Sequence, residues 1–105
     1  YYGESGALNE SISDIFGVML RQWVKNLTVD QDSWLVGPGL FVDPKQRALR
    51  DMLNPGTAYN DANIGKDPQP DHYDRRYKGS ADNAGVHINS GIPNTAFATF
   101  AISLG

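Results

Sequence analysis

The most regular pattern in the sequence lies near its start, where apolar side chains recur at helical spacing over residues 5–25. The positions that carry the pattern are Leu8, Ile12, Ile15, Phe16, Met19, Leu20 and Trp23. At about 100° per residue they fall on one broad stripe, which predicts an amphipathic helix with this stripe packed against the core. Ser5 and Asn9 are candidate caps for its first turn.

Two later segments also carry helix signals. Asp43 followed by Pro44 fits a helix start, and the run KQRALRDML after them predicts a helix that ends before Pro55. A second apolar run, TAFATFAISL, comes directly after Pro93 and predicts a helix from Asn94 onward.

The segments between these helices favour irregular structure. Residues 26–44 are typical of a loop with short extended pieces, and Asn, Asp, Gly and Pro dominate much of residues 54–84. Within the second segment, residues 72–77 (HYDRRY) fit a short helix or a turn. Strand signals are too weak to predict a sheet. The expected fold class is therefore mainly α, with helices joined by long irregular loops.

Composition narrows the class of protein. The chain has 105 residues, of which 40% are hydrophobic and 20% charged, so residues 1–105 are expected to form a single segment of globular type. A net charge of −3 without a basic patch argues against a nucleic acid partner. No apolar run approaches the roughly 18 residues of a membrane-spanning helix. The absence of cysteine excludes disulfides and thiolate metal sites.

Two acids on the first predicted helix leave two interpretations open. Glu10 and Asp14 are four residues apart and share a face opposite the apolar stripe. Acids on such a face are usually solvated. Gly17, one turn further along, favours the alternative, because a helical glycine costs about 1 kcal/mol against alanine and suggests that another segment packs closely there. Covered acids would need a metal, a histidine or an arginine as partner.

A histidine near the end of the chain also has two interpretations. His87 lies in the stretch ADNAGVHINSGIPN, five residues after Asp82. If the chain folds back at Gly85, the Asp82 carboxylate can fix the tautomer of the ring and leave its other nitrogen for a substrate. The alternative is an ordinary histidine of a surface loop. The remaining candidates, His72 and Arg50, fit structural or surface positions, and Arg50 also fits a local ion pair.

Two long motifs resemble those of one known family. The segment ESGALNESISDIFG resembles the part of the thermolysin family of zinc metalloendopeptidases that carries the third zinc ligand, in the pattern N-E-x-x-S-D. DNAGVHINSGIPN is similar to that family's second active-site signature, usually D-N-G-G-V-H-I-N-S-G. ALRDMLNP and PDHYDRRYKG resemble family segments in the same order. The resemblance implies a partial domain of a thermolysin-like metalloprotease, namely its mostly helical C-terminal lobe.

The resemblance assigns metal-related roles to the first motif. Glu10 would be a zinc-binding carboxylate. Asp14 would accept a hydrogen bond from a zinc-bound histidine and so fix its ring, and Asn9 would hold the neighbouring ligand in a similar way. The cofactor implied for the parent enzyme is Zn²⁺.

It assigns catalytic and substrate-binding roles to other positions. His87, oriented by Asp82, would stabilise the tetrahedral oxyanion together with Tyr1. Arg50 would donate a hydrogen bond to the substrate carbonyl just past the scissile bond. Leu49 would line the apolar pocket for the residue on the leaving side. The implied activity is endoproteolysis before bulky apolar residues, by a secreted enzyme that acts on peptides or proteins.

One part of the family pattern is missing from the chain. The H-E-x-x-H helix, which supplies two zinc ligands and the general base, should lie about 20 residues before Glu10. We therefore expect the missing N-terminal part of the same enzyme to be a partner. Alone, the 105 residues should bind no zinc tightly, hydrolyse nothing and expose the face with Glu10, Asp14 and Gly17 or bury it by self-association.

Smaller departures bear on calcium and on the alternative function. Arg21, Leu35 and Pro38 stand where calcium-binding relatives of that family carry carboxylates, which argues against a paired Ca²⁺ site in this loop. Ala84 replaces a glycine, a mild change if its φ is negative. The alternative function is a non-catalytic binding or degenerate domain derived from such a protease.

Overall fold

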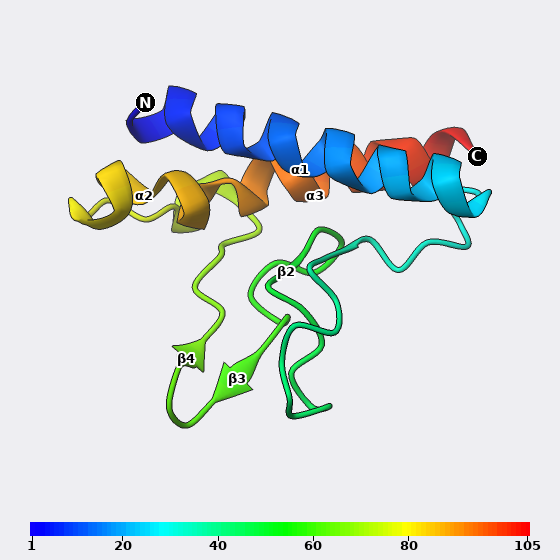
Figure 1. The fold of residues 1–105 in the computed structure, drawn as a ribbon. Coiled ribbons are helices and arrows are strands. Elements are labelled where there is room, and N and C mark those ends of the chain that lie inside the picture. Colours follow the sequence, from blue (N-terminus) through cyan, green and yellow to red (C-terminus); the bar gives the residue numbers. More distant parts are fainter.

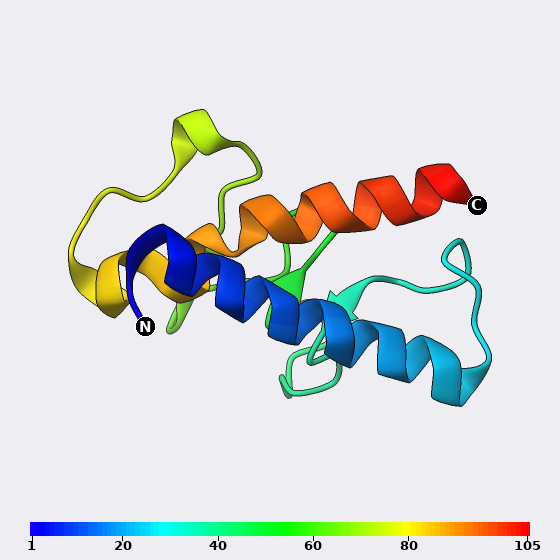
Figure 2. The same ribbon diagram turned by 90° about the horizontal axis from the view of Figure 1, so that it is seen from above.

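Three helices form one layer of the molecule, and a lobe of loops lies against one side of that layer (Figure 1). The computed structural model describes residues 1–105. The layer contains α1 (Gly3–Lys25), α2 (Ala81–Asn89) and α3 (Gly91–Leu104). Seen from above, α2 lies beside the first half of α1, and α3 diverges from α1 toward its C-terminal end (Figure 2). None of the helices is long and apolar enough to cross a membrane. The mainly α fold class is confirmed.

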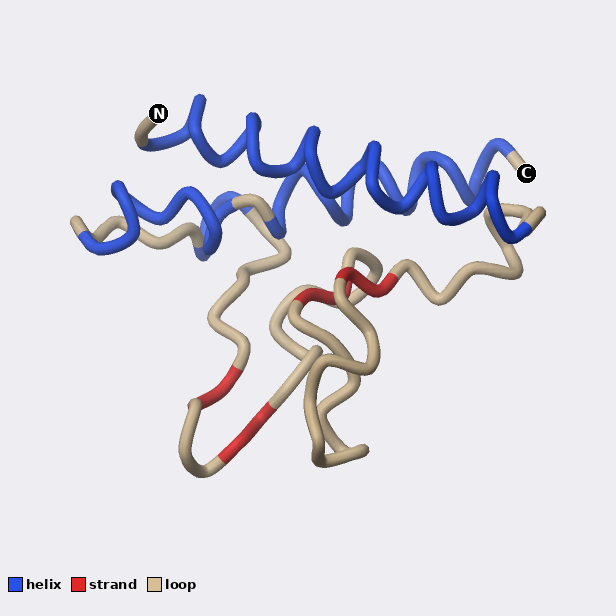
Figure 3. The backbone as a smooth tube through the Cα atoms, viewed as in Figure 1, coloured by secondary structure: helices blue, strands red, loops and turns tan.

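The lobe is built from turns and very short strands (Figure 3). β1 (Leu35–Val36) pairs antiparallel with β2 (Arg50–Asp51), and β3 (Asn60–Asp61) pairs antiparallel with β4 (Gly65–Lys66). A 3₁₀ turn, η1 (Tyr73–Arg75), follows and confirms the short helix predicted within residues 72–77. Each ladder is two residues long, so the lobe holds local pairings rather than an extended sheet.

The end of α1 has a defined stop signal. Asn26 adopts a left-handed conformation with φ 54° and ψ 46°. Its N–H bonds to the carbonyl of Trp23 at 3.2 Å, and the N–H of Leu27 bonds to the carbonyl of Gln22 at 2.8 Å. This pair of bonds is a Schellman motif, which satisfies carbonyls that the helix would otherwise leave free. The predicted helix over residues 5–25 is confirmed to within two residues at its start.

The face of α1 that packs inside the chain is not the one predicted. The buried positions follow one another at spacings of one, three and four residues: Gly6, Ala7, Ser11, Asp14, Val18 and Gln22. Most of the predicted core stripe faces outward instead, with exposed fractions from 44% at Met19 to 79% at Trp23. Only Ile15 of that stripe packs against the core cluster. The helix thus carries two stripes, and the small and polar one makes the contacts within this chain.

The close packing expected beside Gly17 is also absent. A Cβ atom built at Gly17 would meet no atom within 4 Å, and the residue is exposed. Asp14, in contrast, is only 7% exposed. The face with Glu10, Asp14 and Gly17 was predicted to be exposed or to be buried by self-association. Instead, Asp14 is buried by other parts of the same chain, whereas Gly17 is exposed.

A small core joins the helical layer to the lobe. Trp34, Met52 and Ala98 have no exposed surface, and Val18 of α1 is 3% exposed. Phe97 packs edge-on against Trp34, with ring centroids 6.1 Å apart. The indole N–H of Trp34 donates to the carbonyl of Val29 at 2.9 Å, which satisfies the polar edge of a buried ring. This core holds β2 against the middle of α1.

The helix predicted after Pro44 does not form. The N–H groups of this segment bond to distant carbonyls instead: Leu49 to Val36 and Met52 to Trp34, both at 3.0 Å. Asp51 accepts hydrogen bonds from the N–H groups of the two residues of the following turn, at 3.0 and 2.9 Å. Tertiary pairing therefore overrides helix propensity here. The helix predicted from Asn94 onward does form, and α3 begins three residues before Asn94.

The outward apolar stripe predicts self-association of the isolated chain. Side chains such as Phe16 and Leu20, 67% and 60% exposed, lose contact with water when a second surface covers them, and each contributes roughly 1.5–3 kcal/mol when fully buried. We expect the mass measured by light scattering to rise with concentration and to return toward 11.5 kDa in Phe16→Glu/Leu20→Glu. Val42→Glu, at a fully exposed loop position, is the matched control. A concentration-independent monomer would contradict the prediction.

Candidate functional site

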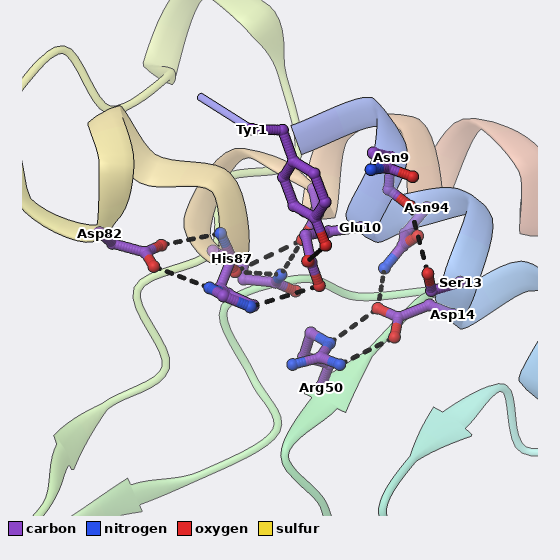
Figure 4. A network of polar contacts seen from close by, with 11 residues as sticks. Tyr1, Asn9, Glu10, Ser13, Asp14, Arg50, Asp82, His87 and Asn94 are labelled. Carbon is purple, nitrogen blue, oxygen red and sulfur yellow. Dashed lines mark hydrogen bonds and ion pairs between the residues drawn. The ribbon is translucent and has the colours of Figure 1, made fainter. Parts of the chain in front are cut away.

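Polar side chains from α1, α2 and β2 meet on one side of α1 (Figure 4). Glu10 lies at the centre of the first group and is 17% exposed. Its Oε1 accepts a hydrogen bond of 2.6 Å from the hydroxyl of Tyr1, and its Oε2 lies 3.3 Å from Nε2 of His87. That hydrogen bond and the negative charge of Glu10 raise the pKa of the Tyr1 hydroxyl, which keeps it a neutral donor.

His87 is held from its other side by Asp82. The ring nitrogen Nδ1 lies 2.7 Å from Oδ1 of Asp82, and Oδ2 of the same carboxylate accepts the backbone N–H of His87 at 2.7 Å. Burial raises the pKa of the Asp82 carboxyl, but the hydrogen bonds from the ring and backbone of His87 outweigh it and leave this pKa below its ordinary value. The predicted contact between the two residues is confirmed, and the Nε2 edge of the ring is left facing Glu10.

A left-handed turn makes the Asp82–His87 contact. Asp82, Asn83, Ala84 and Gly85 all have positive φ, between 50° and 83°. A surface loop was one of the two interpretations for His87, but residues 81–89 form a helix whose first part has the opposite hand. Ala84 has φ 63°, so the negative φ that would make it a mild replacement for glycine is not found. A left-handed conformation costs an L-residue with a Cβ about 1–2 kcal/mol.

Asp14 and Arg50 form the second group of the site. Nε of Arg50 donates to Oδ2 of Asp14 at 2.7 Å, and Nη2 donates to Oδ1 at 2.8 Å, which is a bidentate pair. Burial lowers the pKa of Arg50, but the hydrogen bonds and charge of Asp14, with smaller effects from Glu10 and Asp67, leave it above its ordinary value. Arg50 does form an ion pair, but with a partner 36 residues away rather than the local one that the sequence suggested.

The other predicted residues lie at the edge of this arrangement. Asn9 is exposed, and its backbone carbonyl accepts a hydrogen bond from Ser13 at 3.3 Å. Leu49 is 40% exposed and packs beside Gly37. His72 is exposed and accepts the backbone N–H of Asp74 at 3.1 Å, so it serves as the N-cap of η1. The structural interpretation of His72 is confirmed.

Comparisons with known proteins fit this geometry. The family model for the α-helical domain of thermolysin metallopeptidase matches residues 1–104. The chain belongs to the thermolysin family of metallopeptidases. It is 50% identical over 106 residues to the extracellular metalloprotease of Pectobacterium carotovorum, covering 100% of this chain and 30% of that protein. It is 44% identical over 101 residues to thermolysin of Bacillus caldolyticus, covering 91% of this chain and 15% of that protein.

A solved structure of the same family has the same fold. The precursor of protealysin, a metalloproteinase from Serratia proteamaculans, superposes with a TM-score of 0.96 at 47% sequence identity. The match covers 100% of this chain and 33% of that one. The chain therefore spans a third or less of the length of these family members.

Candidate metal ligands do not gather in this segment. No set of three or more His, Cys, Asp or Glu side chains is placed to hold a metal ion. Catalytic zinc in proteins takes three protein ligands, so Glu10 fits as one carboxylate ligand but does not complete a site. In the loop after α1, Arg21 donates to Asp32 at 2.8 Å and to the carbonyl of Leu35 at 2.5 Å. The Arg21 guanidinium thus lies in the loop where a calcium-binding relative would be expected to carry carboxylates.

Sequence reasoning missed three buried polar residues near the site. Asn94 donates to Oδ2 of Asp14 at 2.9 Å, and Ser11 donates to Asn94 at 2.7 Å. Gln69 donates to the backbone carbonyl of His87 at 2.8 Å and is 5% exposed. The available signal was the helical spacing of Ser11 and Asp14 within the small and polar stripe of α1. Nothing in the local sequence marks Asn94 or Gln69.

The left-handed turn yields a test of stability. Ala84→Gly should raise the free energy of unfolding by about 1 kcal/mol, because glycine adopts positive φ without the Cβ penalty. Urea denaturation at a concentration where the chain is monomeric measures this change. Ala81→Gly, in the same helix but outside the left-handed run, is the matched control and should not raise stability, because Ala81 has no positive φ to relieve. Destabilisation by both substitutions would contradict the assigned conformation of Ala84.

The lowered pKa of Asp82 predicts a dependence of stability on pH. The contribution of a carboxylate with a depressed folded-state pKa is complete above its unfolded pKa of about 3.9 and is lost as pH falls through the lower folded value. The difference in urea midpoint between the unmodified chain and Asp82→Asn should therefore be larger at about pH 5 than at about pH 3. Asp30→Asn, at an exposed acid, is the control. A difference that grows on acidification would refute this assignment.

Proposed function

We propose that the chain is the substrate-binding and charge-stabilising part of a secreted, zinc-dependent endopeptidase. The observation that carries the proposal is the position of Glu10, a carboxylate with Tyr1 on one oxygen at 2.6 Å and His87 on the other at 3.3 Å. Extracellular metalloproteases among its relatives support both the reaction class and the secretion.

Glu10 is the residue proposed to hold the metal. Carboxylates are suitable zinc ligands, and the other two protein ligands come from a part of the parent protein outside residues 1–105. When bound, zinc polarises a carbonyl and makes water a stronger nucleophile. Asp14, four residues along the same helix, and Asn9 are the residues proposed to hold neighbouring ligands through hydrogen bonds.

His87 and Tyr1 are proposed to stabilise the developing negative charge of a tetrahedral oxyanion. The Tyr1 hydroxyl donates to one oxygen of Glu10 and Nε2 of His87 faces the other, so an oxyanion formed beside that carboxylate lies within their reach. Because Asp82 and the left-handed turn fix the ring beforehand, little reorganisation is needed during the reaction.

Arg50 and Leu49 are proposed to bind the substrate on the leaving side. Asp14 takes up Nε and Nη2 of Arg50, which leaves the Nη1 donors for a substrate carbonyl. The neighbouring Leu49 is 40% exposed and offers apolar contact to the substrate residue that follows the scissile bond. This pairing of a fixed cation with an apolar side chain supports a preference for bulky apolar residues at that position.

Substitutions in the full-length parent enzyme test the proposal. His87→Ala should lower kcat for a peptide substrate by about 10²–10³-fold with zinc content unchanged, because it removes one oxyanion donor. Glu10→Ala should lose both zinc, measured by atomic absorption, and hydrolysis. His72→Ala is the matched control, since this histidine is exposed and caps η1. Near-normal hydrolysis by His87→Ala or Glu10→Ala would overturn the role proposed for that residue, whereas no hydrolysis by the unmodified parent protein would favour a non-catalytic domain.

A further inference from the structure

Asn94 occupies an unusual place for an amide side chain. It lies on α3 with no exposed surface, and it contacts α1 through residues 80 or more positions away in the sequence. Its Nδ2 donates to Oδ2 of Asp14 at 2.9 Å, and its Oδ1 accepts from the hydroxyl of Ser11 at 2.7 Å. Ser11 is also fully buried.

The partners of Asn94 leave its amide one orientation. An ionised carboxylate can only accept hydrogen bonds, so Nδ2 must face Asp14. Oδ1 then points to Ser11, whose hydroxyl is a donor for it. Both ends of the buried amide are satisfied only in this arrangement, which removes the alternative in which oxygen and nitrogen exchange places.

The hydrogen bond from Asn94 fixes the plane of the Asp14 carboxylate. The terminal torsion of an aspartate has a broad energy minimum, so the pair with Arg50 alone would let both planes rotate together. Oδ2 of Asp14 accepts from Asn94 at 2.9 Å and from Nε of Arg50 at 2.7 Å (Figure 4). A fixed carboxylate plane fixes the guanidinium plane through the two parallel bonds of the pair. The direction of the free Nη1 edge of Arg50 is therefore set from α3.

We propose that Asn94, supported by Ser11, is a positioning residue that sets the orientation of Arg50 toward the substrate. This inference rests on the proposed role of Arg50 in binding the substrate carbonyl. A purely packing role is a poorer explanation, because an apolar pair between α1 and α3 would need no matched hydrogen bonds. The chain of hydrogen bonds runs from Asn94 on α3 through Asp14 on α1 to Arg50 on β2. It affects substrate binding rather than the oxyanion donors around Glu10.

Asn94→Asp in the full-length enzyme gives a pH-dependent test. The introduced carboxyl group, when protonated, can donate to Asp14 and accept from Ser11, as asparagine does, whereas its ionised form repels Asp14 and competes for Arg50. The charged groups that face this position are Asp14 from α1 and Arg50 from β2. We expect KM near the unmodified value at low pH and about tenfold or more higher at high pH, with kcat changed much less. The unmodified enzyme supplies the reference curve.

Arg50→Ala provides the background that separates positioning from general destabilisation. In that background, Asn94→Asp should change KM no further, because the residue through which it acts is gone. The same fold-change in both backgrounds would overturn the inference. An unchanged KM in Arg50→Ala alone would overturn the role of Arg50 and the inference together, while the losses in Glu10→Ala and His87→Ala would still support the proposed peptidase.

Substitutions at Ser11 provide a second test that applies if variants at Asn94 fail to fold. Ser11→Ala removes only the donor to Oδ1 and should raise KM a few-fold, whereas Ser11→Thr retains a hydroxyl and should keep KM near the unmodified value. Equal KM values in Ser11→Ala and the unmodified enzyme would contradict the inference. So would a loss in kcat alone, because orientation of Arg50 affects binding of the substrate.

Discussion

A carboxylate taken out of water must be paired, and the position of Asp14 makes this requirement the organising constraint of the molecule. Asp14 is 7% exposed and lies in the middle of α1. Its partners are Arg50 from β2 and Asn94 from α3. Satisfying this one side chain therefore requires the lobe, the first helix and the last helix to meet at a single point.

The first helix shows both the reach and the limit of pattern reading. Its existence and extent follow from the spacing of apolar side chains, and the structure agrees within two residues at its start. The direction in which that stripe faces could not be predicted. An apolar stripe indicates that a surface is buried against something, but it does not show which segment or which second chain buries it. Within this chain the residues of α1 that other segments bury include Ser11, Asp14 and Val18 instead. The more polar stripe is held by specific bonds, which hydrophobicity does not reveal.

The site was more predictable than the lobe that supports it. The contact between Asp82 and His87 is local, five residues apart, and a glycine between them marked the fold-back. The β2 segment was mistaken for a helix, since its hydrogen bonds go to Val36 and Trp34 rather than to neighbours. Asn94 was missed for the same reason. Local chemistry can be derived from the sequence, whereas partners separated by many residues depend on the assembled fold.

The long sequence separation of the contacts to Asp14 has a consequence for how the protein folds. Arg50 is 36 residues from Asp14, whereas Asn94 is 80 residues from it. Closing the longer loop costs about 0.7 kcal/mol more entropy than closing the shorter one. The ion pair between α1 and β2 can therefore form in a chain whose last helix is still undocked. Loop entropy thus favours formation of the Asp14–Arg50 pair before the amide of Asn94 reaches the same carboxylate.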